Sequence, residues 1–135
     1  GQVTSATCAI AQKATETAML AEPKSTTKEM KEPFLRRRDL LITELQKING
    51  VKCNIPQGAF YIFPDISFYF GKTDGNITIK NATDLCMYLL NSCFVALVAG
   101  DAFGNPECVR ISYAASDDKL LEATKRIHHQ LKQLY

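Results

Sequence analysis

The sequence predicts an α+β fold in which helices pack on a small sheet. Hydrophobic periodicity along the chain switches between the 3.6-residue period of helices and the two-residue period of strands. The resulting order is helix, helix, strand, strand, helix, strand, strand, helix. The chain has 135 residues, of which 46% are hydrophobic, so it is long enough to build one core. We therefore expect a single layered α+β domain over residues 1–135.

The first two elements are predicted to be helices. Residues 5–21 are rich in Ala, Thr, Gln and Lys, lack interior Gly or Pro, and precede Pro23. A capping box at Thr26–Glu29 begins the second helix, and Asn49-Gly50 ends it. Pro33 should kink this helix or delay its start. The predicted apolar face of the second helix contains Met30, Phe34, Leu41, Leu45 and Ile48.

Four short strands are predicted in the rest of the chain. Apolar and polar side chains alternate in residues 51–55, and the turn Pro56-Gln57-Gly58 leads into a continuous apolar run, 59–63. Such a run indicates a buried strand. The other two strands are residues 94–98 and 108–113. Residues 67–80 contain Gly71, Gly75 and Asn76 and are predicted to form a surface loop.

Two more helices complete the pattern. Asn81, with Asp84 three residues later, should start a short helix that carries Leu85, Tyr88 and Leu89. Ser116 should cap the terminal helix. The apolar face of that helix is predicted to contain Leu120, Ala123, Ile127, Leu131 and Leu134.

Composition excludes several classes of partner. The formal net charge is +2, which gives no strong preference for a polyanion, so no nucleic-acid partner is expected. The longest apolar run, Phe94–Ala99, is too short to cross a bilayer, and no signal peptide is visible. The five cysteines are irregularly spaced without a C-x-x-C pair, and the adjacent His128 and His129 cannot face one metal together. We expect no metal site and a reducing, cytoplasmic setting.

Arg110 is the most informative candidate for a binding residue. Strand alternation places Arg110 and Ser112 on the face opposite to Val109, Ile111 and Tyr113. A planar guanidinium on a rigid strand suits bidentate capture of a carboxylate or phosphate, although a solvated face or an internal ion pair remains open.

Three other polar features are weaker candidates. The loop Gly100–Pro106 either brings backbone close to a ligand or only turns the chain, and its Asp101 is a possible base or ion-pair partner. The run Arg36-Arg37-Arg38 is expected to be a solvated helix face. His128-His129 is expected at the surface, with His128 next to the apolar stripe.

Three ordered segments resemble the fold-type I pyridoxal-phosphate (PLP) aminotransferases, in particular the prokaryotic-type aspartate aminotransferase branch. The first is Gly1-Gln2-Val3-Thr4-Ser5 with Ile10-Ala11-Gln12. The second is Arg36–Leu41 followed by Pro56-Gln57-Gly58-Ala59-Phe60-Tyr61, and the third is Gly100–Gly104 followed by Val109–Ala114. The resemblance covers nearly the whole chain and implies the C-terminal small domain, with helices on a mostly antiparallel sheet.

The resemblance implies roles for individual residues. Arg110 would bind the α-carboxylate of an amino-acid substrate, while Gly58 and Phe60 would lie at the mouth of the active site. Thr4 and Ser5 would lie near the cofactor phosphate of the partner subunit in a homodimer.

The resemblance also implies what this chain lacks. Residues 1–22 would form the helix leading out of a missing large domain, which carries the Schiff-base lysine, so the chain alone should be inactive. Amino acids and 2-oxo acids would be the substrates, with aspartate and glutamate favoured. Prephenate, aromatic or alanine specificity remains an alternative, as does a noncatalytic ligand-binding or interaction module.

Overall fold

The computed structural model describes residues 7–21 and 26–135, and the chain divides into two compact units, Gly1–Pro33 and Phe34–Tyr135. The first unit contains helix α1, Ala9–Leu20, which falls inside the predicted segment 5–21. None of the residues of α1 is buried, and Ile10 and Met19 are each 81% exposed. Within its own unit, the apolar side chains of α1 are therefore not buried.

Helix α2, Thr26–Leu45, continues through Pro33, so the predicted delay in its start is wrong. Proline fixes φ at a value that a helix accepts, and one missing N–H does not end this 20-residue helix. The predicted apolar face is buried at Leu41, Leu45 and Ile48, whereas Met30 is 58% exposed. Turns follow α2 as far as Gly50, whose φ is 82°. A Cβ on Gly50 would lie 2.0 Å from the ring of Phe68.

The sheet has three short antiparallel strands. They are β1, Tyr61–Ile62, β2, Val98–Ala99, and β3, Val109–Ser112, in the order β1-β3-β2. In the register, Tyr61 lies opposite Ser112, and Val98 lies opposite Arg110. The small antiparallel sheet with helices packed on it confirms the predicted fold class.

The structure corrects three of the predicted strands. Residues 51–55 form only an isolated bridge, in which Lys52 and Asp65 exchange backbone hydrogen bonds of 3.1 and 2.9 Å. The run 59–63 shortens to Tyr61–Ile62, and the strand predicted at 94–98 is displaced to Val98–Ala99. Ala59 and Phe94, the first residues of the two runs, have φ of 60° and 58°. A residue in the left-handed region cannot continue an extended strand.

The other two helices agree more closely with expectation. Helix α3, Ala82–Cys93, begins at Asn81, whose side-chain oxygen accepts a 2.9 Å hydrogen bond from the Asp84 N–H. Helix α4, Asp117–Leu131, begins after Ser116, but the Ser116 side chain makes no capping hydrogen bond. Short 3₁₀ helices, η1 at Ser67–Tyr69 and η2 at Gly100–Phe103, lie inside the two predicted loops.

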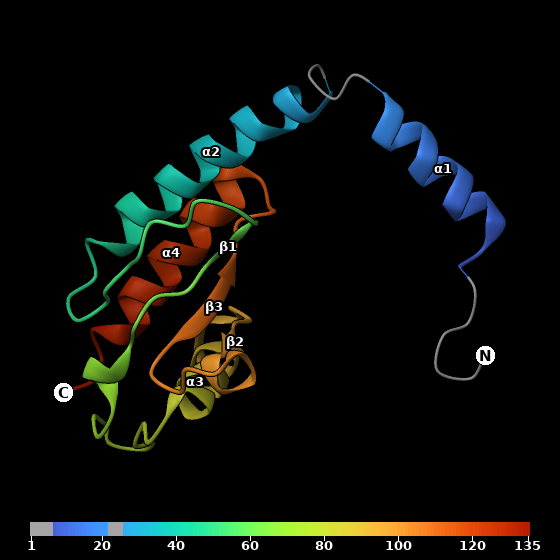
Figure 1. The fold of residues 1–135 in the computed structure, drawn as a ribbon. Coiled ribbons are helices and arrows are strands. Elements are labelled where there is room, and N and C mark those ends of the chain that lie inside the picture. Colours follow the sequence, from blue (N-terminus) through green and yellow to red (C-terminus); the bar gives the residue numbers. More distant parts are fainter. Residues whose placement is uncertain (1–6, 22–25) are drawn as a thin grey trace. The chain divides into compact units, whose positions relative to one another are not determined.

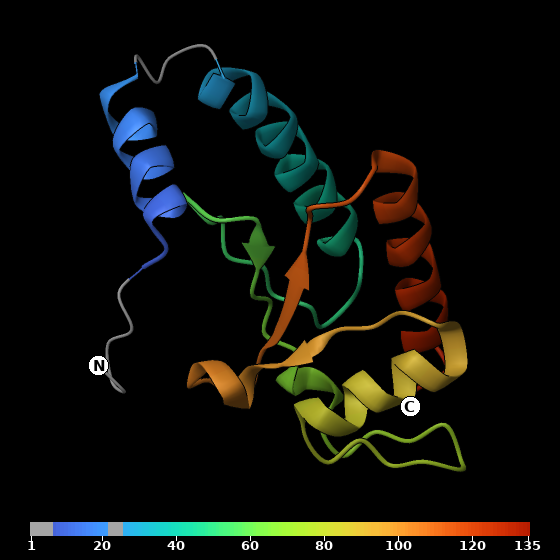
Figure 2. The same cartoon turned by 90° about the vertical axis from the view of Figure 1, so that its right-hand side faces the viewer.

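Helices α2, α3 and α4 share one hydrophobic core with the sheet. In both views α2 and α4 run side by side, with α3 near the β2 end of the sheet (Figures 1 and 2). The core residues with at most 2% exposure include Leu41, Leu45, Ile62, Leu85, Leu89 and Val109. The core therefore fixes one face of β3 and leaves its other face for different chemistry.

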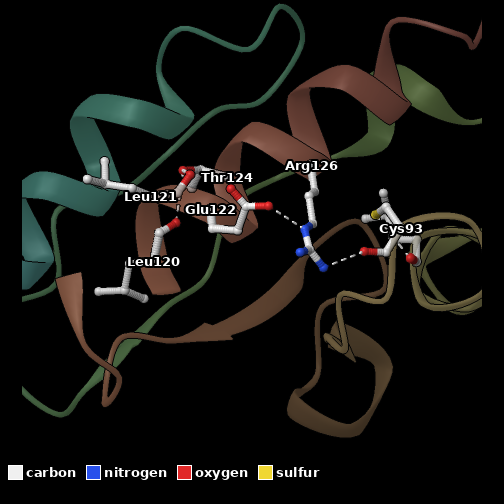
Figure 3. A network of polar contacts seen from close by, with 7 residues as sticks. Cys93, Leu120, Leu121, Glu122, Thr124 and Arg126 are labelled. Atoms are coloured by element: carbon white, nitrogen blue, oxygen red, sulfur yellow. Dashed lines mark hydrogen bonds and ion pairs between the residues drawn. The ribbon is translucent and has the colours of Figure 1, made fainter. Parts of the chain in front are cut away.

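Polar contacts tie α4 to the end of α3 and satisfy a buried hydroxyl (Figure 3). Arg126 donates to Glu122 at 2.8 Å and to the carbonyl oxygen of Cys93 at 3.5 Å. Thr124, which is 3% exposed, occupies part of the buried face that was predicted for Ala123. Its hydroxyl donates to the Leu120 and Leu121 carbonyl oxygens at 2.9 and 3.0 Å, so the buried oxygen has partners.

Neither a membrane span nor a metal cluster is found among the described residues. No described helix is both long and apolar enough to cross a bilayer. Within residues 7–21 and 26–135, no three His, Cys, Asp or Glu side chains come together to hold an ion. All five cysteines are free thiols, with Cys86 and Cys108 buried and Cys8 exposed.

Candidate functional site

The candidate site is built on the face of β3 that points away from the core. Val109 and Ile111 are 1% and 8% exposed and belong to the core, whereas Arg110 is half-buried and Ser112 is exposed. This alternation confirms the two faces expected from the sequence. Because Tyr61 lies opposite Ser112 on β1, its ring is on the same face as Arg110.

The guanidinium group of Arg110 contacts two aromatic rings. Its central carbon lies 4.4 Å from the ring centroid of Tyr61 and 4.2 Å from that of Phe103. Within the part of the chain that the structure describes, no carboxylate lies within ion-pair distance of Arg110. Asp101 is exposed and forms no ion pair with it. The charge of Arg110 is thus stabilised by rings, while its N–H donors have no internal acidic partner.

The loop before β3 is shaped by a close approach of backbone to backbone. The Gly100 N–H donates to the Cys108 carbonyl oxygen at 2.8 Å, and the Asn105 N–H donates to the Gly100 carbonyl oxygen at 3.2 Å. A Cβ at Gly100 would lie 2.1 Å from the Asn105 oxygen and 2.5 Å from the Cys108 oxygen. The glycine is therefore needed for the turn of the loop itself.

The turn before β1 is held by side chains from distant parts of the chain. Arg38 donates to the Pro56 carbonyl oxygen at 3.1 Å, and Tyr113 donates its hydroxyl to the Ala59 carbonyl oxygen at 2.9 Å. Burial raises the pKa of Tyr113, so its phenol keeps the proton that it donates. In this turn Gly58 is exposed, and a Cβ built on it meets no atom within 4 Å. Its predicted role at an active-site mouth remains a prediction.

Phe60 joins this turn to the ring that contacts Arg110. Its ring centroid lies 4.3 Å from that of Tyr61 and 6.2 Å from that of Phe34. Phe60 is 41% exposed, so it is not a core residue. A continuous aromatic surface therefore leads from Phe34 through Phe60 and Tyr61 to the guanidinium group.

The arginine run differs from the solvated face expected for it. Arg36 and Arg37 both reach Asp117 at the start of α4, at 2.9 and 3.4 Å. Arg38 pairs with Asp39 at 2.7 Å, and its side chain is only 20% exposed. The expectation is wrong for Arg37 and Arg38, whose side chains are only partly exposed. Asp117 and the Pro56 carbonyl oxygen, which hold them, are distant in sequence and could not be seen from local spacing. The histidine pair behaves as expected, since His128 is half-buried and His129 is exposed.

The structure brings some of the predicted site residues together and leaves others apart. Arg110 and Phe60 are joined through Tyr61, whereas Gly58 has no neighbour that would define its role. Thr4 and Ser5 lie outside the described residues. Tyr61 and Phe103 were not singled out as binding residues from the sequence. The sequence did contain a signal for them. Tyr61 is an aromatic residue on the strand that pairs with β3, and Phe103 is an aromatic residue in the loop that leads into β3.

Comparisons with known proteins give one consistent result. The family model described as aminotransferase class I and II matches residues 1–127. An aspartate aminotransferase of Pinus pinaster is 44% identical over 136 residues, covering 96% of this chain and 27% of its own length. A bifunctional aspartate aminotransferase and glutamate/aspartate-prephenate aminotransferase of Petunia hybrida is 50% identical over 103 residues, covering 76% of this chain and 22% of its own.

A solved structure gives the same likeness in three dimensions. The crystal structure of the Rhizobium meliloti aspartate aminotransferase superposes with a TM-score of 0.88 at 42% identity, covering 99% of this chain and 34% of that one. The chain thus spans between about a fifth and a third of the length of these relatives.

Proposed function

Because this chain belongs to the class I and II aminotransferases, we propose that it is the C-terminal small-domain part of a longer aspartate aminotransferase. The whole enzyme would move an amino group between aspartate or glutamate and 2-oxo acids. The relatives named for this activity support the proposal, as does the share of their length that the chain spans. The alternatives are another specificity, such as prephenate, aromatic or alanine, and a noncatalytic ligand-binding or interaction module.

The observation that carries the proposal is the guanidinium group of Arg110. It is half-buried on a strand whose other face is core, and it has no acidic partner in the described part of the chain. A fixed planar fork with free N–H donors binds a carboxylate through two parallel hydrogen bonds. Arg110 would thereby orient the amino acid so that its amine points away from the clamp.

The family implies a PLP-dependent reaction, so the lysines decide whether this chain could hold the cofactor. The ammonium groups of Lys13, Lys47 and Lys52 pair with carboxylates, and that of Lys72 lies over the ring of Phe68. None of these contacts involves Arg110 or the rings around it. These four lysines therefore take no part in the face that carries Arg110, and the proposal assigns that face to the substrate carboxylate.

When bound, pyridoxal phosphate supplies the carbonyl group that takes up and releases the amine. We propose that its lysine is encoded upstream of Gly1. In the same proposal the enzyme is a cytoplasmic homodimer, in which Thr4 and Ser5 lie near the cofactor phosphate of the partner subunit. Gly58 and Phe60 would lie at the mouth of the site.

The first experiment reads the coding sequence upstream of Gly1 and assays its product. A PLP-lysine segment and transfer from aspartate to 2-oxoglutarate are expected. An upstream region without such a segment would leave only the noncatalytic alternative. Equal or faster turnover of alanine, an aromatic amino acid or prephenate as the partner substrate would replace the aspartate assignment.

The second experiment tests Arg110 in the complete enzyme. Removing one partner of a buried charge pair costs about 2–5 kcal/mol, so Arg110→Ala should lower kcat/KM by roughly 30-fold or more with cofactor still bound. Arg126→Ala is a matched control, because Arg126 is a partly exposed arginine that pairs with Glu122 on α4. Unchanged kinetics for Arg110→Ala would remove Arg110 from the site.

A further inference from the structure

We propose that Phe103 is a positioning residue, which together with Tyr61 holds the guanidinium group of Arg110 in the orientation that binds a carboxylate. This inference rests on the proposed function, since it concerns the same carboxylate clamp. Phe103 does not itself touch the substrate in this proposal; it acts through Arg110. It is carried by the placement of an exposed aromatic ring that core packing does not explain.

Phe103 is 46% exposed, so burial in the core does not account for where its ring lies. Its centroid lies 4.2 Å from the Arg110 guanidinium carbon. It also lies 6.2 Å from the ring centroid of Phe63, at an interplanar angle of 89°, which is the edge-to-face arrangement that aromatic pairs prefer. Phe63 therefore supports the ring of Phe103 while Phe103 contacts Arg110.

The backbone that carries Phe103 is held in place by the close approach at Gly100. Besides the hydrogen bonds of Gly100, the Gly104 N–H donates to the Asp101 carbonyl oxygen at 3.2 Å. The side chain of Asn105 accepts from the Glu107 N–H at 3.0 Å. Gly104 itself has φ 82°, which turns the chain directly after the phenylalanine. These contacts fix where the ring of Phe103 can lie.

The two rings reach Arg110 from the two sides of its strand. In the sheet order β1-β3-β2, Tyr61 lies on β1 and Phe103 follows β2, so the strand of Arg110 runs between them. A ring can cover the flat face of a guanidinium group without using its N–H donors, which all lie in the plane. The rings thus restrict rotation of the side chain and exclude water, while the donor edge stays free for a carboxylate.

The experiment uses the complete enzyme. It measures the Kd of maleate, a dicarboxylate without an amino group that serves as the probe of the carboxylate clamp, together with the KM for aspartate, kcat and the melting temperature. Phe103→Leu keeps apolar bulk but removes the aromatic face, and it should raise the maleate Kd and the KM about 3- to 10-fold, more than it changes kcat. Phe103→Tyr restores the ring and should restore affinity. If Phe103→Leu does not fold, Phe103→Met replaces it, and the same rise in the maleate Kd and the KM is expected.

Phe68→Leu is the matched control. Phe68 is also 46% exposed and also contacts a cation, since its ring lies 4.8 Å from the Lys72 ammonium nitrogen. Its replacement should leave the maleate Kd unchanged even where it lowers the melting temperature. An equal loss of affinity in Phe68→Leu would overturn the inference, because the effect would then be a general loss of stability.

A double variant separates this inference from the proposed function. Arg110→Gln should weaken maleate binding more than tenfold, and adding Phe103→Leu to it should change the Kd less than twofold. If Arg110→Gln weakens binding and Phe103→Leu does not, the positioning role is refuted and the clamp stands. If Arg110→Gln leaves the Kd unchanged, the proposed function of Arg110 is refuted and the positioning role with it.

Discussion

Replacing Gly100 by alanine should destabilise the chain strongly, although it adds only one methyl group. Gly100 begins η2, and the added Cβ would lie 2.1 Å from the Asn105 oxygen, 2.5 Å from the Cys108 oxygen and 3.0 Å from the Cys108 carbonyl carbon. All three are backbone atoms, so relief requires the loop to move away from the start of β3. Flexible side chains cannot absorb this clash.

The size of the effect follows from the contacts at risk. Forcing an extra methyl group into a packed site costs about 1–3 kcal/mol. The Gly100 N–H to Cys108 and Asn105 N–H to Gly100 hydrogen bonds, at 2.8 and 3.2 Å, would lengthen or break. Each contributes about 1 kcal/mol, so we expect Gly100→Ala to lower the free energy of unfolding by about 2–4 kcal/mol.

Urea unfolding followed by circular dichroism at 222 nm measures this free energy, and thermal unfolding checks it. A loss of about 2–4 kcal/mol corresponds to a fall in Tm of roughly 8–16 °C for a unit of this size. Gly58→Ala is the control, because its Cβ meets no atom within 4 Å and its φ is not positive. That variant should be neutral or more stable by up to about 1 kcal/mol. If the free energy of unfolding of Gly100→Ala lies within about 0.5 kcal/mol of that of the wild type, the reasoning is refuted, since ordinary surface substitutions change it by no more than that.

Two further predictions concern α3. Burial raises the pKa of Cys86 to about 11 from 9.0. Between these two pH values the folded state keeps a proton that the unfolded state releases. The free energy of unfolding should therefore fall as pH rises from 9 through about 11. Cys86→Ala should flatten that slope in urea titrations, and equal slopes in both chains would contradict the assignment. Asn81→Ala removes the hydrogen bond to the Asp84 N–H and should cost about 1 kcal/mol in urea unfolding. Ser116→Ala, which loses no capping bond, should cost much less, and an equal loss would refute the capping argument.

The elements that could be predicted from the sequence are those in which local pattern and tertiary packing agree. Helix α3 begins at the predicted cap and buries Leu85, Tyr88 and Leu89, because the apolar stripe and the cap point to the same helix. The alternation in β3 likewise placed Arg110 opposite the core.

The strand boundaries could not be predicted because hydrophobicity does not report backbone angles. Ala59 and Phe94 both begin apolar runs, yet both have positive φ, which local sequence predicts only for Gly and, less strongly, Asn. In Ala59 the left-handed turn is held by the hydroxyl of Tyr113, 54 residues away. Phe94 has its positive φ because it is the C-cap of α3, where its N–H donates to the Leu89 and Leu90 carbonyl oxygens. Both strands therefore begin later than the hydrophobic pattern indicated.

Only part of the candidate site could be predicted, because contacts between separate elements complete it. Arg110 is visible from its own strand, whereas its aromatic neighbours depend on the pairing register and on the shape of the η2 loop. Tyr61 reaches it from β1 and Phe103 from η2, and neither relation is encoded in local spacing. The partners of Arg37 and Arg38 were missed because they are distant in sequence.

The two faces of β3 also define how freely this region tolerates redesign. Val109 and Ile111 are buried in the core, so replacing either by a smaller residue should destabilise the chain. Ser112 and Val98 share the opposite face with Arg110 and are both exposed. Substitutions at those two positions should change the surroundings of the guanidinium group and have little effect on the stability of the fold. This face can therefore be varied while the core preserves the scaffold beneath it.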